Sequence, residues 1–352
     1  MTQIPTTTMP KHSPLMTTLL AVGRHKAVWP IAALALIFLI DFIISPNFFS
    51  IRIVEGRLFG SVIDVFYRAV PTAMVALGMA VVIGTAGIDL SVGSVIAIGG
   101  AVITWRIHAG DPHILILFWA LGVGLLCGIW NGFLVAVLDI QPIIATLILM
   151  VSGRGIGLMI NLLYGGTNPS YTSALLQGIS TGHIPFIPIP TRLLVFLLVF
   201  VVLWALLRRT ALGMFLESVG ANKKAAYLTG INARLVTYSA YIICGLTAAA
   251  AGVILCADTH TSDPVSIGRN IEMDAILAVV IGGGSLAGGR VYLGMTILGA
   301  LVIQALTTSI LSSGVPPEYN LMVEAVVVIV VLLLQSPNFR NLALSIVARR
   351  KR

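Results

Sequence analysis

The sequence predicts an all-α polytopic membrane protein that forms a single domain. Of the 352 residues, 58% are hydrophobic and 10% are charged, whereas a soluble protein carries roughly 25% charged residues. The apolar residues lie in long runs, as spanning helices require, and two of these runs are interrupted by glycine. No linker divides the chain, so we expect one transmembrane domain at 27–335, between a tail at 1–26 and a basic tail at 336–352.

About ten apolar segments follow one another along the chain, and a spanning helix needs about 20 residues. They are 27–44, 64–84, 91–107, 114–138, 142–163, 191–207, 234–257, 274–284, 291–311 and 319–335. The first is too long for a signal-peptide core, and no cleavage site follows it, so we expect it to span the membrane. The eighth is too short to cross alone, which favours a half-helix that enters a turn.

The distribution of basic residues predicts which loops lie in the cytoplasm. Lys and Arg cluster at 11–26, 208–234 and 340–352, whereas 165–191 contains none. Basic segments remain on the cytoplasmic side of a membrane, so both termini are expected there, which agrees with an even number of helices. The formal net charge of +8 then reflects topology and gives no reason to expect nucleic-acid binding. The loops predicted to face outward are 46–62, 108–113, 164–190 and 258–273.

The stretch 78–100, GMAVVIGTAGIDLSVGSVIAIGG, begins and ends as an apolar segment but is broken in the middle by small and polar residues, including Asp89 and Ser91. An Asp at mid-bilayer costs roughly 2.5–3.5 kcal/mol. Backbone that leaves the helix at that depth persists only where it is buried in protein or lines a cavity. We therefore expect Asp89 and Ser91 to lie on a translocation path or in the packing that shapes it.

A related pattern returns near the other end of the chain. The sequence AVVIG at 80–84 reappears at 278–282, and a second glycine-rich break, GGGSLAGGR, follows at 282–290. Paired, glycine-interrupted apolar segments are the best sequence indication of a translocation site in a transporter. The second break adds Gly282, Gly283 and Ser285 to the predicted path.

Two further polar residues lie inside predicted spans. Asn131 follows Trp130 in GIWNG, and Arg154 lies near the centre of 142–163. A buried guanidinium needs a partner, for which the candidates are Asp89 and the backbone carbonyls at the glycine breaks. Arg154 is therefore either part of a structural ion pair or a residue of the path.

The segment 208–233 is too polar to span and is the main cytoplasmic feature between the termini. Residues 211–219 and 223–228 have helical composition, Gly220 and Gly230 punctuate them, and Asn222 can cap the second helix. We expect a short amphipathic helix pair, and a solvated loop is the alternative.

Other chemistries lack the residues that they need. The sequence GSLAGGRV at 284–291 has Arg290 and Val291 where a phosphate-binding loop requires Lys and Ser or Thr. We see no metal-binding His cluster and no paired carboxylates for a membrane-embedded enzyme, so no metal site is expected. A path without a visible energy source leaves two functions open: a transport subunit powered by another chain, and an ion-coupled secondary carrier that uses Asp89 or Arg154.

Three separated motifs resemble one family. GIDLSVGS at 87–94, the second glycine break at 282–290, and TALGMF with VGANKKAAYLTGI at 210–231 resemble permease subunits of bacterial ABC importers for sugars of the ribose, xylose and arabinose type. The likeness covers about residues 60–335. EGRLFG at 55–60 and the stretch 141–154 are most similar to permeases of galactofuranose importers. Ala86 and Val291 depart from the family, which often has Gly at both positions.

The resemblance implies partners and roles. A cytoplasmic ATPase subunit would bind ATP and Mg²⁺, so no cofactor is expected in this chain and it is not an enzyme. A periplasmic sugar-binding protein would deliver a monosaccharide, and a second permease chain, a paralogue or a copy, would complete the path in the bacterial inner membrane. The residues that fall where such permeases dock into the ATPase are Glu217, Gly220, Asn222, Ala225, Ala226 and Gly230.

Overall fold

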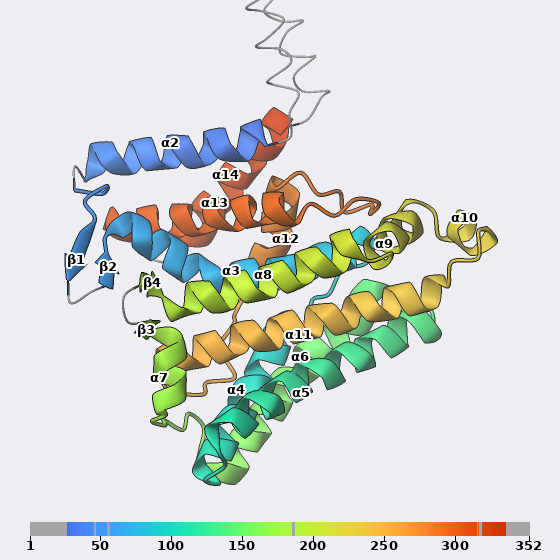
Figure 1. Cartoon of the computed structure of the whole chain (residues 1–352), viewed down its shortest axis with the longest axis horizontal. Coiled ribbons are helices and arrows are strands. Elements are labelled where there is room, and N and C mark those ends of the chain that lie inside the picture. The colour runs from blue at the N-terminus through green and yellow to red at the C-terminus, as the bar shows by residue number, and fades with distance from the viewer. Residues whose placement is uncertain are drawn as a thin grey trace, which may run out of the picture.

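The computed structural model describes residues 27–45, 47–54, 57–184, 187–314, 316 and 319–335. The predicted tails at 1–26 and 336–352 lie outside the described residues, as does Glu55 of the EGRLFG phrase. The described part is a bundle of helices with small elements at its two ends (Figure 1).

Six helices in the described residues are long and apolar enough to cross a membrane, which confirms the polytopic helical class. They are α3 (Ser61–Gly84), α5 (His113–Gly132) with its π-helical continuation η1 (Phe133–Val137), α6 (Pro142–Tyr164), α8 (Thr191–Arg209), α11 (Ala233–Thr259) and α13 (Leu293–Ser312). Shorter apolar helices are α2 (Val28–Ile44), α4 (Val92–His108) and α9 (Leu212–Ala221). The chain also forms α12 (Ile271–Ile281) and α14 (Asn320–Gln335).

Helices α3 and α11 form the interior of the bundle. Their apolar spans are each 78% buried, whereas those of α5 and α8 are 22% and 17% buried. Helix α11 packs against α3, α4 and α5, and α3 packs against α12 and α13. Helix α8 exposes large apolar side chains such as Leu198 and Val202. An apolar outer surface of this kind suits lipid, because hydrocarbon is the solvent of a spanning helix.

Glycines allow α5 and α11 to approach closely. A Cβ atom at Gly245 would lie 2.2 Å from the carbonyl oxygen of Gly124, and one at Gly128 would lie 2.7 Å from the Cα atom of Ile242. Small residues let helix backbones meet in this way. Gly122 is different, because a Cβ atom there would have no neighbour within 4 Å.

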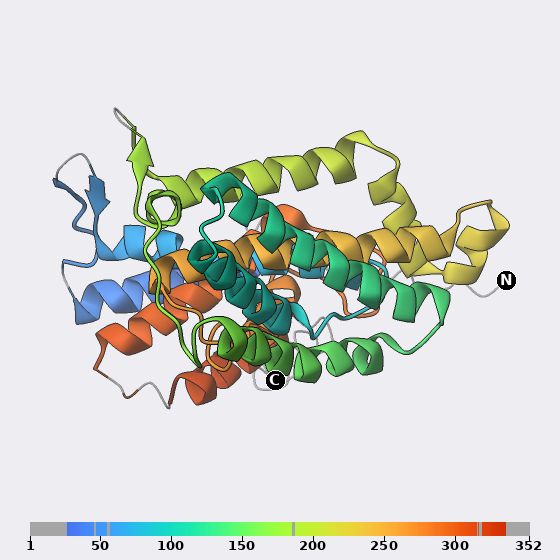
Figure 2. The same ribbon diagram turned by 90° about the horizontal axis from the view of Figure 1, so that it is seen from below.

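Small elements occupy the two opposite ends of the bundle (Figures 1 and 2). One end carries the hairpin of β1 (Arg52–Val54) and β2 (Arg57–Phe59), helix α7 (Ala174–Ser180), and the pair β3 (His183–Ile184) and β4 (Ile187–Pro190). The other end carries α9 and α10 (Lys223–Leu228).

A buried arginine connects α7 to the helix bundle through an ion pair and a hydrogen bond. The guanidinium of Arg192, at the start of α8, pairs with Asp258 of α11 and donates to Ser180 Oγ at 3.4 Å. It also lies 3.6 Å from the ring centre of Tyr67 in α3. Three long helices are therefore held to α7 through one side chain.

Candidate translocation and coupling site

The two glycine breaks meet at the end of the bundle that carries α9. Helix α3 ends at Gly84 and helix α12 ends at Ile281, so each break directly follows one copy of the AVVIG repeat. The N–H of Gly289, in the second break, donates to the carbonyl oxygen of Gly84 at 3.1 Å. Gly84 also faces Val291, since a Cβ atom on it would lie 2.4 Å from Val291 Cγ2.

Helix α9 lies directly on this meeting point. A Cβ atom at Gly220 would lie 1.8 Å from the Gly84 carbonyl oxygen and 2.7 Å from the Gly289 nitrogen. The carboxylate of Glu217 accepts a hydrogen bond from the backbone N–H of Val291 at 3.2 Å. We call the contact of Gly84, Glu217, Gly220, Gly289 and Val291 the inner junction.

The remaining residues of 208–233 form the expected helix pair. Asn222 Oδ1 accepts from the N–H of Ala225 at 3.0 Å and caps α10, which confirms the predicted helix and cap. Ala225 is exposed and Ala226 is buried. Gly230 has a φ of +86°, a left-handed conformation that favours glycine.

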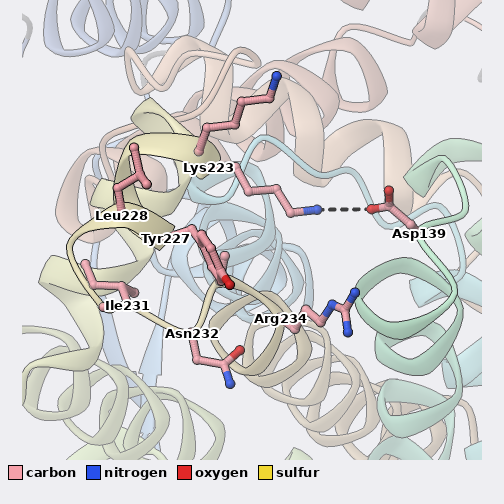
Figure 3. Close-up of a pocket in the computed structure, with 10 residues that line it drawn as sticks. Asp139, Lys223, Tyr227, Leu228, Ile231, Asn232 and Arg234 are labelled. Atoms are coloured by element: carbon pink, nitrogen blue, oxygen red, sulfur yellow. Dashed lines mark hydrogen bonds and ion pairs between the residues drawn. The ribbon is translucent and has the colours of Figure 1, made fainter.

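A pair of charges joins α10 to the turn between η1 and α6. Lys223 Nζ lies 3.1 Å from Asp139 Oδ1, beside a surface pocket that Arg234 and the exposed Tyr227 and Leu228 also line (Figure 3). Both charged side chains are largely exposed, so this pair adds little stability. The pair marks where α10 meets the helix bundle, at the turn that precedes α6.

Asp89, Ser91 and Asn131 form one buried network. Asp89 Oδ1 accepts from the backbone N–H of Ser91 at 2.9 Å and from its hydroxyl at 2.6 Å. Asn131 Nδ2 donates to Ser91 Oγ at 2.7 Å and lies 3.3 Å from Asp89 Oδ1. Each of the three residues is at most 1% exposed. The network ties α5 to the first break and holds the carboxylate beside the first turn of α4, where a negative charge is favoured.

The predicted residues of the second break lie apart from this network. Gly282 follows α12 and packs against the backbone of Met295, and Gly283 has a φ of +80°. Ser285 is exposed, and its hydroxyl accepts from the N–H of Ala287 at 3.2 Å.

Arg154 binds neither of its expected partners. Its guanidinium donates to the carbonyl oxygens of Pro264, Val265, Ile267 and Gly268 at 2.9–3.3 Å. The expectation that 258–273 is simply an outer loop is therefore wrong for its central part, which lies beside the middle of α6. Its polar composition suggested an outer loop, but the five N–H donors of a guanidinium satisfy the carbonyls that a helix would otherwise pair.

Three acidic residues that the sequence did not single out lie on α12 and α14. Glu272 is 7% exposed, and a Cβ atom at Gly93 would lie 2.7 Å from its Oε2. Asp274 of α12 interacts with the carboxyl group of Glu324 of α14. Asp274 is the first residue of the predicted span 274–284, and Glu324 lies within the predicted span 319–335. No glycine break interrupts the sequence at either residue, so the sequence pattern did not indicate a functional role for them. No group of three or more His, Cys, Asp or Glu in the described part of the chain is arranged to hold a metal ion.

A bundle of apolar helices with two joined glycine breaks, and a short helix pair seated on them, defines the class of polytopic membrane permeases. The chain belongs to the family of permease components of branched-chain amino acid transport systems, whose family model matches residues 61–332.

The chain is also similar to curated sugar permeases over most of its length. It is 45% identical to the galactofuranose transporter permease protein YtfT of Escherichia coli, over 97% of this chain and 99% of the relative. It is 37% identical to the fructose import permease protein FruF of Bifidobacterium longum, over 92% and 91% of the two chains. It is 33% identical to the ribose import permease protein RbsC of Escherichia coli, over 87% and 92%. These similarities confirm the resemblance that the motifs indicated. No solved structure gives a significant match.

Proposed function

We propose that this chain is the permease subunit of an ATP-binding-cassette importer and that it translocates a monosaccharide by alternating access. The observation that carries the proposal is the inner junction, in which α9 touches both glycine breaks through Gly220 and Glu217. A force applied to α9 from outside the bundle acts directly on the end of α3 at Gly84 and on the second break at Gly289 and Val291, just before α13 begins. The names of the curated relatives support the sugar as the cargo.

In this mechanism an ATPase subunit supplies the force. Closure of the ATPase pushes on 214–231, and the segments around 84–94 and 282–290 change the side to which they open. The contact to the ATPase is assigned to Glu217, Gly220, Asn222, Ala225, Ala226 and Gly230. ATP and Mg²⁺ bind to the ATPase. This chain binds no cofactor and catalyses no covalent reaction.

The path is assigned to the residues that the two breaks and their neighbours contribute. These are Asp89, Ser91, Asn131, Arg154, Gly282, Gly283 and Ser285. The buried network of Asp89, Ser91 and Asn131 fits a role in shaping the path, because all three side chains already bond to one another. Arg154 acts in the same way on the segment 264–268.

The assembly and its orientation complete the proposal. The domain at 27–335 crosses the bacterial inner membrane ten times, with both termini and α9–α10 in the cytoplasm and α7 outside. A periplasmic sugar-binding protein meets the α7 end, and a second permease chain, a paralogue or a copy, encloses the path. The cargo is galactofuranose or a related sugar. Uptake competition in a deletion strain, across pentoses and furanose hexoses, identifies it.

Reconstitution separates this function from an ion-coupled secondary carrier. Proteoliposomes receive either this chain alone or the chain with its ATPase, second permease and binding protein. We expect sugar flux only in the complete assembly and only with ATP. Sugar flux through this chain alone, driven by a proton or sodium gradient, would contradict the proposal and support the carrier.

A further inference from the structure

The segment 263–269 is non-helical backbone at the depth of the middle of a spanning helix. Its anchor, Arg154, lies 12 residues after Pro142 and 10 before Tyr164, the two ends of α6, or about 18 Å and 15 Å at the helical rise. Pro264 packs against Gly157 on the next turn of α6, where a Cβ atom would lie 3.1 Å from Pro264 Cβ. At this depth, irregular backbone must be buried in protein or line a water-filled space.

One side of the segment is held against the bundle. Arg154 donates to four of its carbonyl oxygens. Just before it, Asn161 of α6 donates to the carbonyl oxygen of Ser262 at 2.8 Å. Ile267 is 8% exposed, and Gly268 lies against Ile96 of α4. This side is therefore protein-lined and has its carbonyls paired.

The opposite side is exposed and carries two polar side chains beside one valine. Val265 is 60% exposed, and Ser266 and Arg269 are also exposed. An arginine that faced lipid at mid-bilayer would cost roughly 2.5–3.5 kcal/mol on insertion scales. The outer face of α8 presents Leu198, Val201 and Val202, which are typical of a lipid contact. The exposed side of 263–269 differs from that face and is suited to water.

The hydrogen-bonding chemistry of this side fits a hydroxyl-rich ligand. Ser266 Oγ donates to Asp263 Oδ2 at 2.5 Å, which leaves its oxygen lone pairs able to accept from a hydroxyl. Asp263 Oδ1 accepts from the N–H of Val265 at 3.0 Å and holds the turn. The guanidinium of Arg269 brings donors for hydroxyl or ring oxygens.

We propose that the exposed side of 263–269 lines the translocation path, that Ser266 and Arg269 contact the sugar there, and that Arg154 is the positioning residue that holds the segment in place. The sugar contact rests on the proposed function. The exposure of the segment to water does not.

Cysteine labelling tests the water-facing side in the complete importer. Ser266→Cys and Val202→Cys are compared, since Val202 is an exposed residue of α8 near the middle of that helix. Background labelling is measured on the unmodified protein, which contains buried Cys244 and Cys256 and half-buried Cys127. A membrane-impermeant methanethiosulfonate reagent should label Ser266→Cys about tenfold faster or more, because a thiol in hydrocarbon does not ionise. Equal rates at the two positions would overturn the proposal.

Protection by sugar tests the contact. Ribose, fructose and galactofuranose are added one at a time during labelling of Ser266→Cys, and the transported one should slow the reaction. Fast labelling that none of them slows would overturn the sugar contact. Failure of the proposed function would appear differently, as absence of ATP-driven uptake by the unmodified assembly.

Two substitutions separate contact from positioning. Arg269→Gln should raise the KM for sugar uptake about tenfold with little change in kcat, as loss of roughly 1.4 kcal/mol of binding does. Arg154→Gln should lower kcat and also change the labelling rate of Ser266→Cys, because the segment loses its anchor. An unchanged KM in Arg269→Gln, or an unchanged labelling rate in Arg154→Gln, would count against the assigned role.

Discussion

Gly220 illustrates how little room the inner junction leaves at the scale of single residues. Its α-carbon faces the carbonyl oxygen of Gly84 and the N–H of Gly289, which themselves form a hydrogen bond. Only a hydrogen atom fits at that point. Any side chain at position 220 would separate α9 from the two glycine breaks.

Gly220→Ala should therefore uncouple the importer. The Cβ atom would lie 1.8 Å from the Gly84 oxygen, and overpacking of this kind costs roughly 1–3 kcal/mol. If this cost destabilises the conformation in which α9 contacts both glycine breaks, the population of that conformation falls roughly 5–150-fold. ATP hydrolysis and sugar uptake are measured together. Gly294→Ala is the control, because a Cβ atom there has no neighbour within 4 Å, and equal uptake in both variants would rule out the close contact.

Glu217 gives a graded test of the same junction. Glu217→Ala removes the acceptor for the N–H of Val291, and a hydrogen bond to a charged group contributes roughly 1.5–3 kcal/mol. Glu217→Gln keeps a carbonyl oxygen in nearly the same place. We expect sugar transported per ATP to fall in Glu217→Ala and to stay close to the unmodified value in Glu217→Gln. If sugar transported per ATP fell equally in both variants, the effect would come from loss of the negative charge of Glu217 at the contact with the ATPase and not from the hydrogen bond to Val291.

The Asp89 network should be visible as stability. Asp89→Ala leaves the backbone N–H and hydroxyl of Ser91 without their acceptor, at roughly 1–3 kcal/mol for each buried group, while the amide of Asn131 keeps its hydrogen bond to Ser91 Oγ. Asp89→Asn retains one oxygen and should cost less. The stability of each variant is measured as the midpoint of thermal unfolding in detergent. A thiol-reactive dye reports unfolding, since buried Cys244 and Cys256 react only when the protein unfolds. Equal midpoints for all three proteins would exclude a structural role.

The residues that the sequence could reveal are those whose chemistry contrasts with their surroundings. Asp89, Asn131 and Arg154 are visible because they are polar inside apolar runs. Their partners are less visible. Asp89 bonds to residues two and 42 positions away, and Arg154 bonds to backbone carbonyls more than 100 positions away, which any residue type would supply.

At the scale of elements, the close pairing of α5 and α11 is the clearest relation between sequence and packing. Gly124 and Gly128 lie one helical turn apart on α5, and both face the backbone of α11. A glycine-rich helix predicts a close contact but does not say which glycine makes it, because the direction of each Cα depends on how the helix is rotated in the bundle. Gly122 points into open space for that reason.

Two alanine substitutions on α5 should have opposite outcomes. Gly124→Ala would place a Cβ atom 2.4 Å from the Gly245 carbonyl oxygen and should lower the unfolding midpoint in detergent. Gly122→Ala meets nothing within 4 Å and should leave the midpoint unchanged or raise it, because Ala is better than Gly in a helix by roughly 0.8–1.0 kcal/mol. The same dye assay measures both. A larger loss in Gly122→Ala would contradict the packing.

Element boundaries were predictable where local chemistry sets them. The expected helices at 211–219 and 223–228 correspond to α9 (Leu212–Ala221) and α10 (Lys223–Leu228), and the expected cap is Asn222. The segment 258–273 was not predictable from its own residues. Its polarity is typical of an outer loop, and only the long-range contact with Arg154 allows it to run beside the middle of α6.

For the whole molecule, hydropathy and the paired breaks were enough to predict a helical membrane permease, because bilayer thickness constrains the sequence directly. The order in which helices pack around α3 and α11 was not predictable, since lipid-facing and buried helices are equally apolar. Orientation depends on charge alone. The α9–α10 end carries Lys223, Lys224 and Arg234, which predicts that it is cytoplasmic.

Labelling from the two sides of the membrane tests that orientation. Gln177 on α7 and Lys224 on α10 are both exposed and lie at opposite ends of the bundle. Gln177→Cys should react with an impermeant thiol reagent in spheroplasts, and Lys224→Cys should react only after the membrane is opened. The reverse order would invert the topology.

The inner junction is built from peptide groups and a single carboxylate, and this has a consequence for how cargo preference can diverge. Its contacts are made mostly by main-chain atoms of glycines, which do not touch the segment beside Arg154. We expect substitutions beside Arg154 to alter which sugar is carried without changing the contact of α9 with the two glycine breaks. The same energy-coupling contact is therefore compatible with permeases that recognise different solutes.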